Sequence, residues 1–141
     1  MDQETNQIYS LLQLGMIRQR PIMLYGDSAA KRLSYIKEAL NDLRTNEKED
    51  VKLILIDLAQ IDDKQLVLSD LYSDISRDQR YLLFLDNLDK TSFDVYESAR
   101  LLLKNGKYPT NFDCIAGLSK EKVEPDYIDD GLVSSCLHIE V

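Results

Sequence analysis

Apolar residues along the chain form two kinds of pattern, short continuous runs and longer stretches with helical spacing. Five runs are almost continuously apolar and predict strands: residues 21–25 (PIMLY), 51–58 (VKLILIDL), 81–89 (YLLFLDNLD), 112–119 (FDCIAGLS) and 136–141 (CLHIEV). Stretches with apolar residues three or four positions apart predict amphipathic helices: residues 5–18, 28–43, 62–76 and 92–106. Strands that are apolar on both faces must be covered on both faces. The order therefore predicts one α/β domain, residues 1–141, with a parallel sheet between helices.

Residues with strong local preferences mark the ends of these helices. Pro21 follows the first helix, and Gly106 is placed to end the helix over 92–106. Ser28 can cap the helix after the first strand, and Ala29 and Ala30 favour an early start of that helix, at Ser28 or Ala29. The charged residues 45–50 and the acidic stretch 120–131 are expected to be solvated connections.

The composition is that of an ordinary globular domain and narrows the range of partners. Apolar residues make up 44% of the chain and charged residues 30%, with a net charge of −8. Such an acidic chain is not drawn to DNA or RNA phosphates by charge. The sequence has no apolar run near the roughly 18 residues of a membrane span and no signal peptide. We therefore expect a cytoplasmic protein without a membrane partner, and no disulfide between Cys114 and Cys136.

Several segments together resemble the core domain of AAA+ P-loop ATPases, from about residue 5 to the end. PIMLYGDS (21–28) resembles the strand and first glycine of the Walker A loop, and YLLFLDNLDK (81–90) resembles Walker B. Residues 91–120 are similar to the helix and fourth strand that lead to the sensor position, and VEPDYIDDGLVSSCLHIEV (123–141) is similar to the last part of the core. Bacterial subgroups, MoxR-like and Clp-like among them, share this layout.

The resemblance implies a particular fold for the chain. It is a three-layer α/β/α sandwich whose five-stranded parallel sheet has the order 5-1-4-3-2, with the strand at 21–25 in a central place. Ligands of such sheets lie at the carboxyl ends of the strands. The small helical lid that follows the AAA+ core is missing from these residues, so either the lid has been lost or the chain is a fragment that stops before it.

The phosphate-binding loop departs from the family pattern of Gly, four residues, Gly, Lys, and Ser or Thr. Gly26 keeps the first place, but Lys31 stands at the second glycine, Arg32 at the lysine and Leu33 at the magnesium-binding hydroxyl. If the alignment is shifted by one residue, Lys31 stands at the lysine position of the motif, but Arg32 then stands at the Ser or Thr position. Without the second glycine the loop is less able to curl around a phosphate, and leucine offers no oxygen to a metal ion.

The other family positions are also altered. Asp86 can take the metal-side place of Walker B, but Asn87 replaces the glutamate that polarises water, and an amide cannot accept a proton at neutral pH. Ser119 or Lys120 stands at the sensor position. The arginine that a neighbouring subunit supplies in this family should fall near Leu132, and no arginine occurs after residue 100.

These positions predict a degenerate nucleotide site with no catalytic residue and no metal ligand. Its members come from four segments: Gly26, Asp27, Ser28, Lys31, Arg32, Asp86, Asn87 and Ser119. We expect no cofactor and an internal salt bridge from the first turn of the helix to Asp27 or Asp86 where a phosphate would otherwise bind. Weak binding of ATP–Mg or phosphate at the amino end of the helix is the alternative.

The expected function is that of a pseudo-ATPase that binds proteins. Its partner would be an AAA+ ATPase, another copy of the chain or another protein. The alternative is a divergent ATPase that uses Arg32 and Asp86 together with groups of a partner subunit. A phospho-accepting receiver domain also presents aspartates at strand ends, but it needs an acidic pair after its first strand, where this chain has Gly26 and Asp27. His138, the only histidine, is expected to be half-buried in the last strand.

Overall fold

A computed structural model describes residues 3–14, 21–61, 78–105, 111–119 and 136–141. Its elements, in chain order, are helix α1 (Gln3–Leu14), strand β1 (Ile22–Tyr25), helix α2 (Ala29–Glu47), strands β2 (Val51–Asp57) and β3 (Arg80–Asp86), the short 3₁₀ helix η2 (Leu88–Lys90), helix α4 (Phe93–Asn105), and strands β4 (Phe112–Leu118) and β5 (Leu137–Glu140). The expected helix over 62–76, the helix end at Gly106 and the acidic stretch 120–131 lie outside the described residues.

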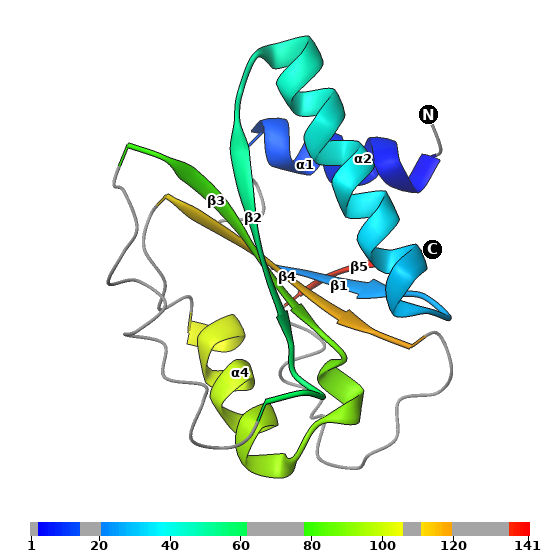
Figure 1. The fold of residues 1–141 in the computed structure, drawn as a ribbon, viewed down its shortest axis with the longest axis vertical. Coiled ribbons are helices and arrows are strands. Elements are labelled where there is room, and N and C mark those ends of the chain that lie inside the picture. Colours follow the sequence, from blue (N-terminus) through cyan, green and yellow to red (C-terminus); the bar gives the residue numbers. More distant parts are fainter. Residues whose placement is uncertain (1–2, 15–20, 62–77, 106–110, 120–135) are drawn as a thin grey trace.

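The sheet has the strand order β2-β3-β4-β1-β5 (Figure 1), and each neighbouring pair is parallel. This is the predicted order 5-1-4-3-2 read from the other edge, so the predicted sheet is confirmed. Strand β1 lies between β4 and β5, with Ile22 opposite Ile115 on one side and Leu137 on the other. Its central place explains why Ile22, Met23 and Leu24 are fully buried.

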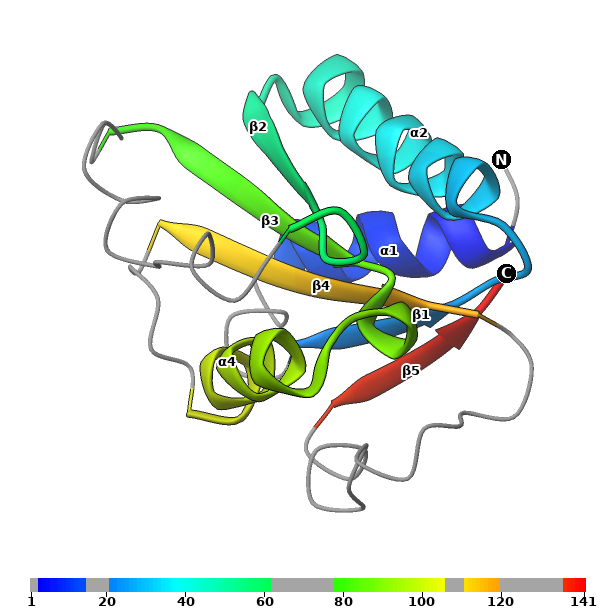
Figure 2. The same cartoon turned by 60° about the horizontal axis from the view of Figure 1, so that its bottom comes forward.

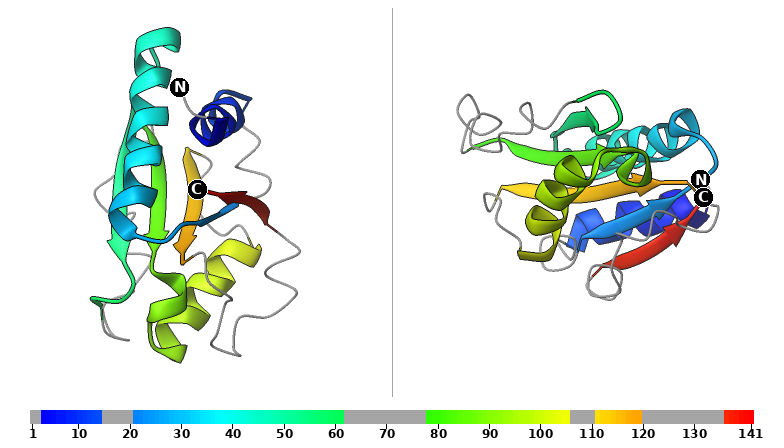
Figure 3. Two further views of the ribbon diagram at one scale, coloured as in Figure 1. Left: turned by 90° about the vertical axis from the view of Figure 1, so that its right-hand side faces the viewer. Right: turned by 90° about the horizontal axis from the view of Figure 1, so that it is seen from below.

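Helices cover both faces of the sheet and complete the predicted three layers (Figures 2 and 3). On one face, Ile8 and Leu12 of α1 and Ile36 and Leu43 of α2 pack against sheet residues such as Leu24. On the other face the α4 side chains form a second core. Its helical members are Val95, Tyr96, Ala99, Leu102 and Leu103. Alternate residues of the central strands face opposite layers, which is why these strands read as continuous apolar runs.

The start of α2 follows the local preferences of its sequence. Ser28 is the N-cap in extended backbone, and its Oγ accepts a hydrogen bond from the N–H of Lys31 at 3.1 Å. The helix begins at Ala29, as predicted, and ends before Lys48, whose φ of 56° is left-handed. Only residues 26–28 therefore connect β1 with α2.

Four details differ from the expectations. Helix α2 continues to Glu47 and so includes residues 45–47 of the expected connection 45–50. The apolar run 81–89 is not one strand, because β3 ends at Asp86 and η2 begins at Leu88. Asn87 makes the turn between them with a φ of 60°, a left-handed conformation that asparagine tolerates better than most residues. The first helix begins at Gln3 rather than residue 5, and residues 15–18 lie outside the described part. His138 is exposed rather than half-buried, and its ring stacks on Tyr25 with centroids 5.5 Å apart.

The cysteines and the helices bear on the expected absence of a disulfide and of a membrane span. Cys114 and Cys136 are both buried free thiols, and no disulfide joins them, as expected. In the described part of the chain no helix is long and apolar enough to cross a membrane.

Candidate functional site

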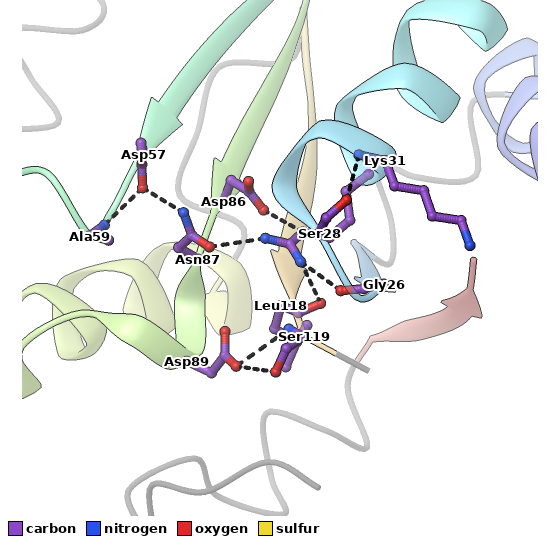
Figure 4. Close-up of polar contacts among 11 residues, drawn as sticks. Gly26, Ser28, Lys31, Asp57, Ala59, Asp86, Asn87, Asp89, Leu118 and Ser119 are labelled. Atoms are coloured by element: carbon purple, nitrogen blue, oxygen red, sulfur yellow. Dashed lines mark hydrogen bonds and ion pairs between the residues drawn. The ribbon is translucent and has the colours of Figure 1, made fainter. Parts of the chain in front are cut away.

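The candidate site lies where the carboxyl ends of three neighbouring strands meet the first turn of α2 (Figure 4). Gly26 follows β1, Asp86 is the last residue of β3, and Leu118 is the last residue of β4. Arg32 enters this space from α2. Parallel strands bring residues from distant parts of the sequence together here, because all their carboxyl ends lie on one side of the sheet.

Arg32 is the largest fully buried side chain of the described residues, with 1% of its surface exposed. Its Nε donates to Oδ1 of Asp86 at 2.8 Å, which makes a buried salt bridge. Its Nη1 donates to the backbone oxygens of Gly26 at 2.7 Å and Leu118 at 3.3 Å. Its Nη2 donates to Oδ1 of Asn87 at 2.9 Å. The guanidinium thus joins the ends of all three strands.

This arrangement satisfies what a buried cation requires. A charge removed from water must be paired and hydrogen-bonded, and Asp86 supplies the opposite charge while two backbone oxygens and an amide accept the remaining hydrogen bonds. A cation near the amino end of a helix is opposed by the helix dipole, so the ion pair also offsets that cost. Of the two predicted acidic partners, Asp86 is the one that pairs with Arg32, whereas Asp27 is exposed.

The turn from β1 to α2 is packed tightly around Arg32. A Cβ added at Gly26 would lie 2.7 Å from Cγ2 of Val141 and 3.0 Å from Cγ of Arg32, so a larger residue would displace these neighbours. Asp27, Ser28 and Lys31 are exposed, and the Lys31 side chain points away from the other labelled residues of the site (Figure 4). These three predicted site residues therefore lie on the outside of the turn, and the exposed Lys31 is not part of the buried cluster.

Asn87 connects Arg32 with a third acidic residue that the sequence analysis did not assign to the site. While its Oδ1 accepts from Arg32, its Nδ2 donates to Oδ1 of Asp57 at 2.7 Å, at the end of β2. The same oxygen of Asp57 accepts from the N–H of Ala59 at 3.0 Å. A side chain that donates on one end and accepts on the other fits between a cation and a carboxylate. The available signal was that the runs 51–58 and 81–89 both carry an aspartate near their ends.

Ser119 lies beside the cluster but does not contact Arg32 through its side chain. Its hydroxyl donates to Oδ2 of Asp89 at 2.6 Å, and its N–H donates to the same oxygen at 3.3 Å. Asp89, in η2, was also outside the predicted set. The pair holds the end of β4 against η2, next to Leu118.

Gly117 explains why Asp86 can lie so close to β4. A Cβ at Gly117 would be 2.1 Å from Oδ1 of Asp86 and 2.8 Å from Cε1 of Phe84. A larger residue here would push the carboxylate away from Arg32. In the described residues, histidine, cysteine, aspartate and glutamate form no group of three or more that could hold a metal ion.

Sequence comparisons and structural comparisons give different results for this chain. No protein-family model and no curated protein matches the sequence. Solved structures match nearly the whole chain: RuvB of Thermotoga maritima (TM-score 0.62, 13% identity, 100% of this chain and 45% of that chain), Orc1 of Aeropyrum pernix in complex with DNA (0.63, 12%, 98% and 43%), and a chain of the Escherichia coli MS115-1 HORMA–CdnC–Trip13 complex (0.62, 13%, 99% and 62%). These neighbours are AAA+ ATPases. This chain has the fold of an AAA+ P-loop ATPase core.

The similarity to these solved structures is limited in sequence identity and in length. At 12–13% identity it shows the fold, and this chain spans roughly half the length of the chains it resembles. In an AAA+ core the phosphate loop joins the first strand to the next helix, and in this chain that connection is the turn at 26–28. The Arg32 cluster lies next to this connection, with Nη1 of Arg32 bonded to the backbone oxygen of Gly26.

Proposed function

We propose that this chain is an AAA+ pseudo-ATPase that acts by binding other proteins. The observation that carries the proposal is the buried guanidinium of Arg32, which is paired with Asp86 at the position where nucleotide phosphates would be bound. The cation of the protein itself would neutralise the aspartate that in an ATPase faces the metal ion. The site would then be closed permanently, and the domain would be held together without a nucleotide.

The residues present do not fit a complex of Mg²⁺ and ATP. Only residues 26–28 connect β1 with α2, so no longer loop can wrap around a phosphate, and in the first turn of the helix the N–H of Lys31 already bonds to Ser28. Leu33 provides no oxygen for a metal ion. Asp86 would have to release Arg32, and breaking a buried ion pair costs about 3–5 kcal/mol. Binding ATP would have to overcome all three obstacles.

A role in protein binding is supported by the AAA+ fold of the chain together with the altered residues at the positions where an AAA+ protein hydrolyses ATP. Some of the similar structures were determined as assemblies, such as the HORMA–CdnC–Trip13 complex. For this chain we infer a protein partner in the cytoplasm, either an AAA+ ATPase, a second copy or another protein, that recognises the surface of the domain. The net charge of −8 opposes direct binding to nucleic acid, although several of the similar structures are complexes with DNA.

A divergent ATPase is the second candidate because Arg32 keeps a positive charge at the place of the Walker A lysine. If a partner subunit displaced the guanidinium, Asp86 would become available to a metal ion. Arginine differs from lysine in its wide, planar fork, which here contacts three strand ends at once. In this alternative, nucleotide binding appears only when the partner is present.

Thermal unfolding with and without Mg–ATP tests the proposal on the whole chain. A ligand present at about 100 times its Kd stabilises a protein by about 2.7 kcal/mol, which raises the Tm of a domain of this size by several degrees. We expect no shift with Mg–ATP at about 1 mM, a typical upper value for KM, and no phosphate release above the buffer blank. A turnover that disappears in Asp86→Ala but persists in Asp27→Ala, which changes an exposed aspartate, would overturn the proposal.

A further inference from the structure

The strand β2 forms one edge of the sheet and carries exposed apolar surface. It pairs with β3, and no other described strand lies on its outer side. The N–H of Leu58 donates to the backbone oxygen of Asp86 in β3. The backbone N–H and C=O groups of every second residue in a strand point to the same side, so even-numbered residues face β3 and odd-numbered residues face away from it. The N–H and C=O groups of Leu53 and Leu55 therefore point to the open edge. The Leu55 side chain is 46% exposed.

A groove runs beside the start of this edge, between β2 and the second half of α2, two elements that lie next to each other in Figure 1. Its volume is about 330 Å³. Leu40 from α2 and Val51 and Leu53 from β2 provide its apolar lining. The side chains of Leu53 and Leu55 lie on the α2 side of the sheet, because they have the same parity as Val51, which belongs to the α1–α2 core.

Basic side chains line the groove on the α2 side. Lys37 and Arg44 are seven residues apart on the helix, or about 10 Å along its axis. Neither forms a salt bridge within the described part of the chain, and Arg44 donates only to the amide oxygen of Asn41, at 2.9 Å. Asp50 is the one acidic residue of the lining. In a chain with a net charge of −8, this groove has a local surplus of positive charge.

We propose that the β2 edge and this groove bind an extended segment of a partner protein in which acidic and apolar residues face the groove in turn. The segment adds to β2 as a sixth strand through the outward groups of Leu53 and Leu55. Its groove-facing side chains recur every second residue, so an acidic, an apolar and a second acidic residue span about 13 Å. The outer two reach Lys37 and Arg44, and the middle one packs on Leu40 and Leu53.

The same features weigh against a second copy of the chain as the occupant. Two copies would each carry a charge of −8, which opposes their approach. Each would also present a basic groove rather than the acidic side chains that the groove of the other copy could pair with. An acidic segment of another protein satisfies the charge of the groove and the hydrogen-bonding groups of the edge together.

A labelled peptide TETVTET, with TKTVTKT as its charge-reversed match, tests this surface by fluorescence anisotropy on the whole chain. We expect saturable binding of TETVTET alone. Lys37→Glu should lower its affinity about tenfold, and the double variant Lys37→Glu/Arg44→Glu should lower it further, since like charges then face each other. Lys90→Glu, an exposed lysine of η2, is the matched control and should leave the affinity unchanged.

A second pair of variants separates the contribution of strand pairing to peptide binding from the contribution of the charges. Leu55→Pro removes an outward N–H while the bonds from β2 to β3 remain, and should abolish binding, whereas Leu55→Thr keeps the N–H and should bind. Three results would overturn the inference. They are equal binding of both peptides, no binding of TETVTET, and a dimer in analytical ultracentrifugation that Leu55→Pro dissociates. The inference rests on the proposed binding role but not on the Arg32 site. ATP binding would overturn only the pseudo-ATPase proposal, and failure of the peptide would overturn only the docking surface.

Discussion

Two arginines, the buried Arg32 and the half-buried Arg80, connect strands at opposite ends of the same sheet. At the amino end of β3, Nε of Arg80 donates to Asp113 of β4 at 2.8 Å, and its Nη1 donates to Glu49 before β2 at 2.7 Å. Its Nη2 donates to the backbone oxygen of Leu12 in α1 at 2.6 Å. Both guanidinium groups thus join elements that are far apart in the sequence, and each pairs with a carboxylate of 5% exposure or less.

The two networks differ in their access to water and in their charge balance. The Arg80 side chain is 11% exposed and faces two carboxylates, and one of these, Glu49, is 42% exposed. Burial lowers the pKa of Arg80, but Glu49 and Asp113 more than offset this, so the pKa is raised. Arg32 is 1% exposed, and Asp86 is the only carboxylate among its direct partners.

The comparison contrasts the Arg80 cluster with the Arg32 cluster, which lies at the position of the proposed function. Ligands of parallel α/β sheets bind at the carboxyl ends of the strands, so nothing in the fold requires the amino end to stay open, and Arg80 can stabilise it without any cost in function. In the proposed function, Arg32 fills the end of the sheet that a nucleotide would need. The ion pair at the amino end of β3 therefore only stabilises the fold. In the proposed function, the ion pair at the carboxyl end also closes the site.

Arg32→Met is expected to have the largest effect on stability. It leaves Asp86 buried without a cation, which should lower the free energy of unfolding by about 3–5 kcal/mol. Urea denaturation measures this loss. The double variant Arg32→Met/Asp86→Leu removes both charges and should recover part of it, whereas Lys31→Met, next to it but exposed, should change stability by less than about 0.5 kcal/mol. A loss below about 1 kcal/mol for Arg32→Met would show that the cluster is not a buried ion pair.

Arg80→Met should have a smaller effect, about 1–3 kcal/mol, because it leaves Asp113 buried without its guanidinium while water can still reach Glu49. Glu49→Gln should cost at most about 1 kcal/mol, as expected for the exposed half of an ion pair. The same urea experiment gives both values. If Arg80→Met proved more harmful than Arg32→Met, the ranking of the two networks by burial would be wrong.

Asn87→Glu restores the residue type of Walker B without repairing the site. Glutamate lacks the N–H group that donates to Asp57, and it must adopt the left-handed backbone of Asn87, so we expect about 1–2 kcal/mol of destabilisation. ATP hydrolysis should stay at the level of the buffer blank, because Leu33 and the helical turn are unchanged. Phosphate release by Asn87→Glu would show that the glutamate was the only missing part.

The pH dependence of stability tests the burial of Cys114 in β4, the strand that both arginines contact. Burial, followed by the neighbouring Cys136 and Asp113, raises the pKa of the Cys114 thiol above its ordinary value of 9.0. Above pH 9 the unfolded chain releases this proton while the folded chain keeps it. The free energy of unfolding should therefore fall with rising pH, by up to about 1.4 kcal/mol per pH unit. Urea denaturation at pH 8 and pH 10 should show a smaller fall for Cys114→Ala, and an unchanged fall would contradict the assignment.

The sequence predicts the fold well because each element has a strong local signal. The strands of the sheet core are continuous apolar runs, Ser28 caps α2, and two alanines start the helix early. The break in the run 81–89 was missed because Leu88 is buried in η2 and so looks like part of a strand. His138 was misplaced because a single apolar run does not show which of its residues face solvent at a sheet edge.

The site could be predicted only in part, because its contacts depend on strand order. The sequence left two candidates, Asp27 and Asp86, for the salt bridge with the first turn of α2. It could not identify Asp86, because this residue lies 54 positions from Arg32. The link from Asn87 to Asp57 requires β2 and β3 to be neighbours in register, with Asp57 opposite Asp86. The Arg80 network was not anticipated, because its partners come from three other segments.

Isothermal titration of the whole chain with Mg–ATP tests the closed site most directly, with ADP and GTP as further ligands and titration into buffer as the blank. The account predicts heats equal to the blank for all three, because Arg32 holds Asp86 and the strand ends that a phosphate would need. A Kd at or below about 10 μM, equivalent to about −7 kcal/mol, would contradict it and show that the site still binds nucleotide.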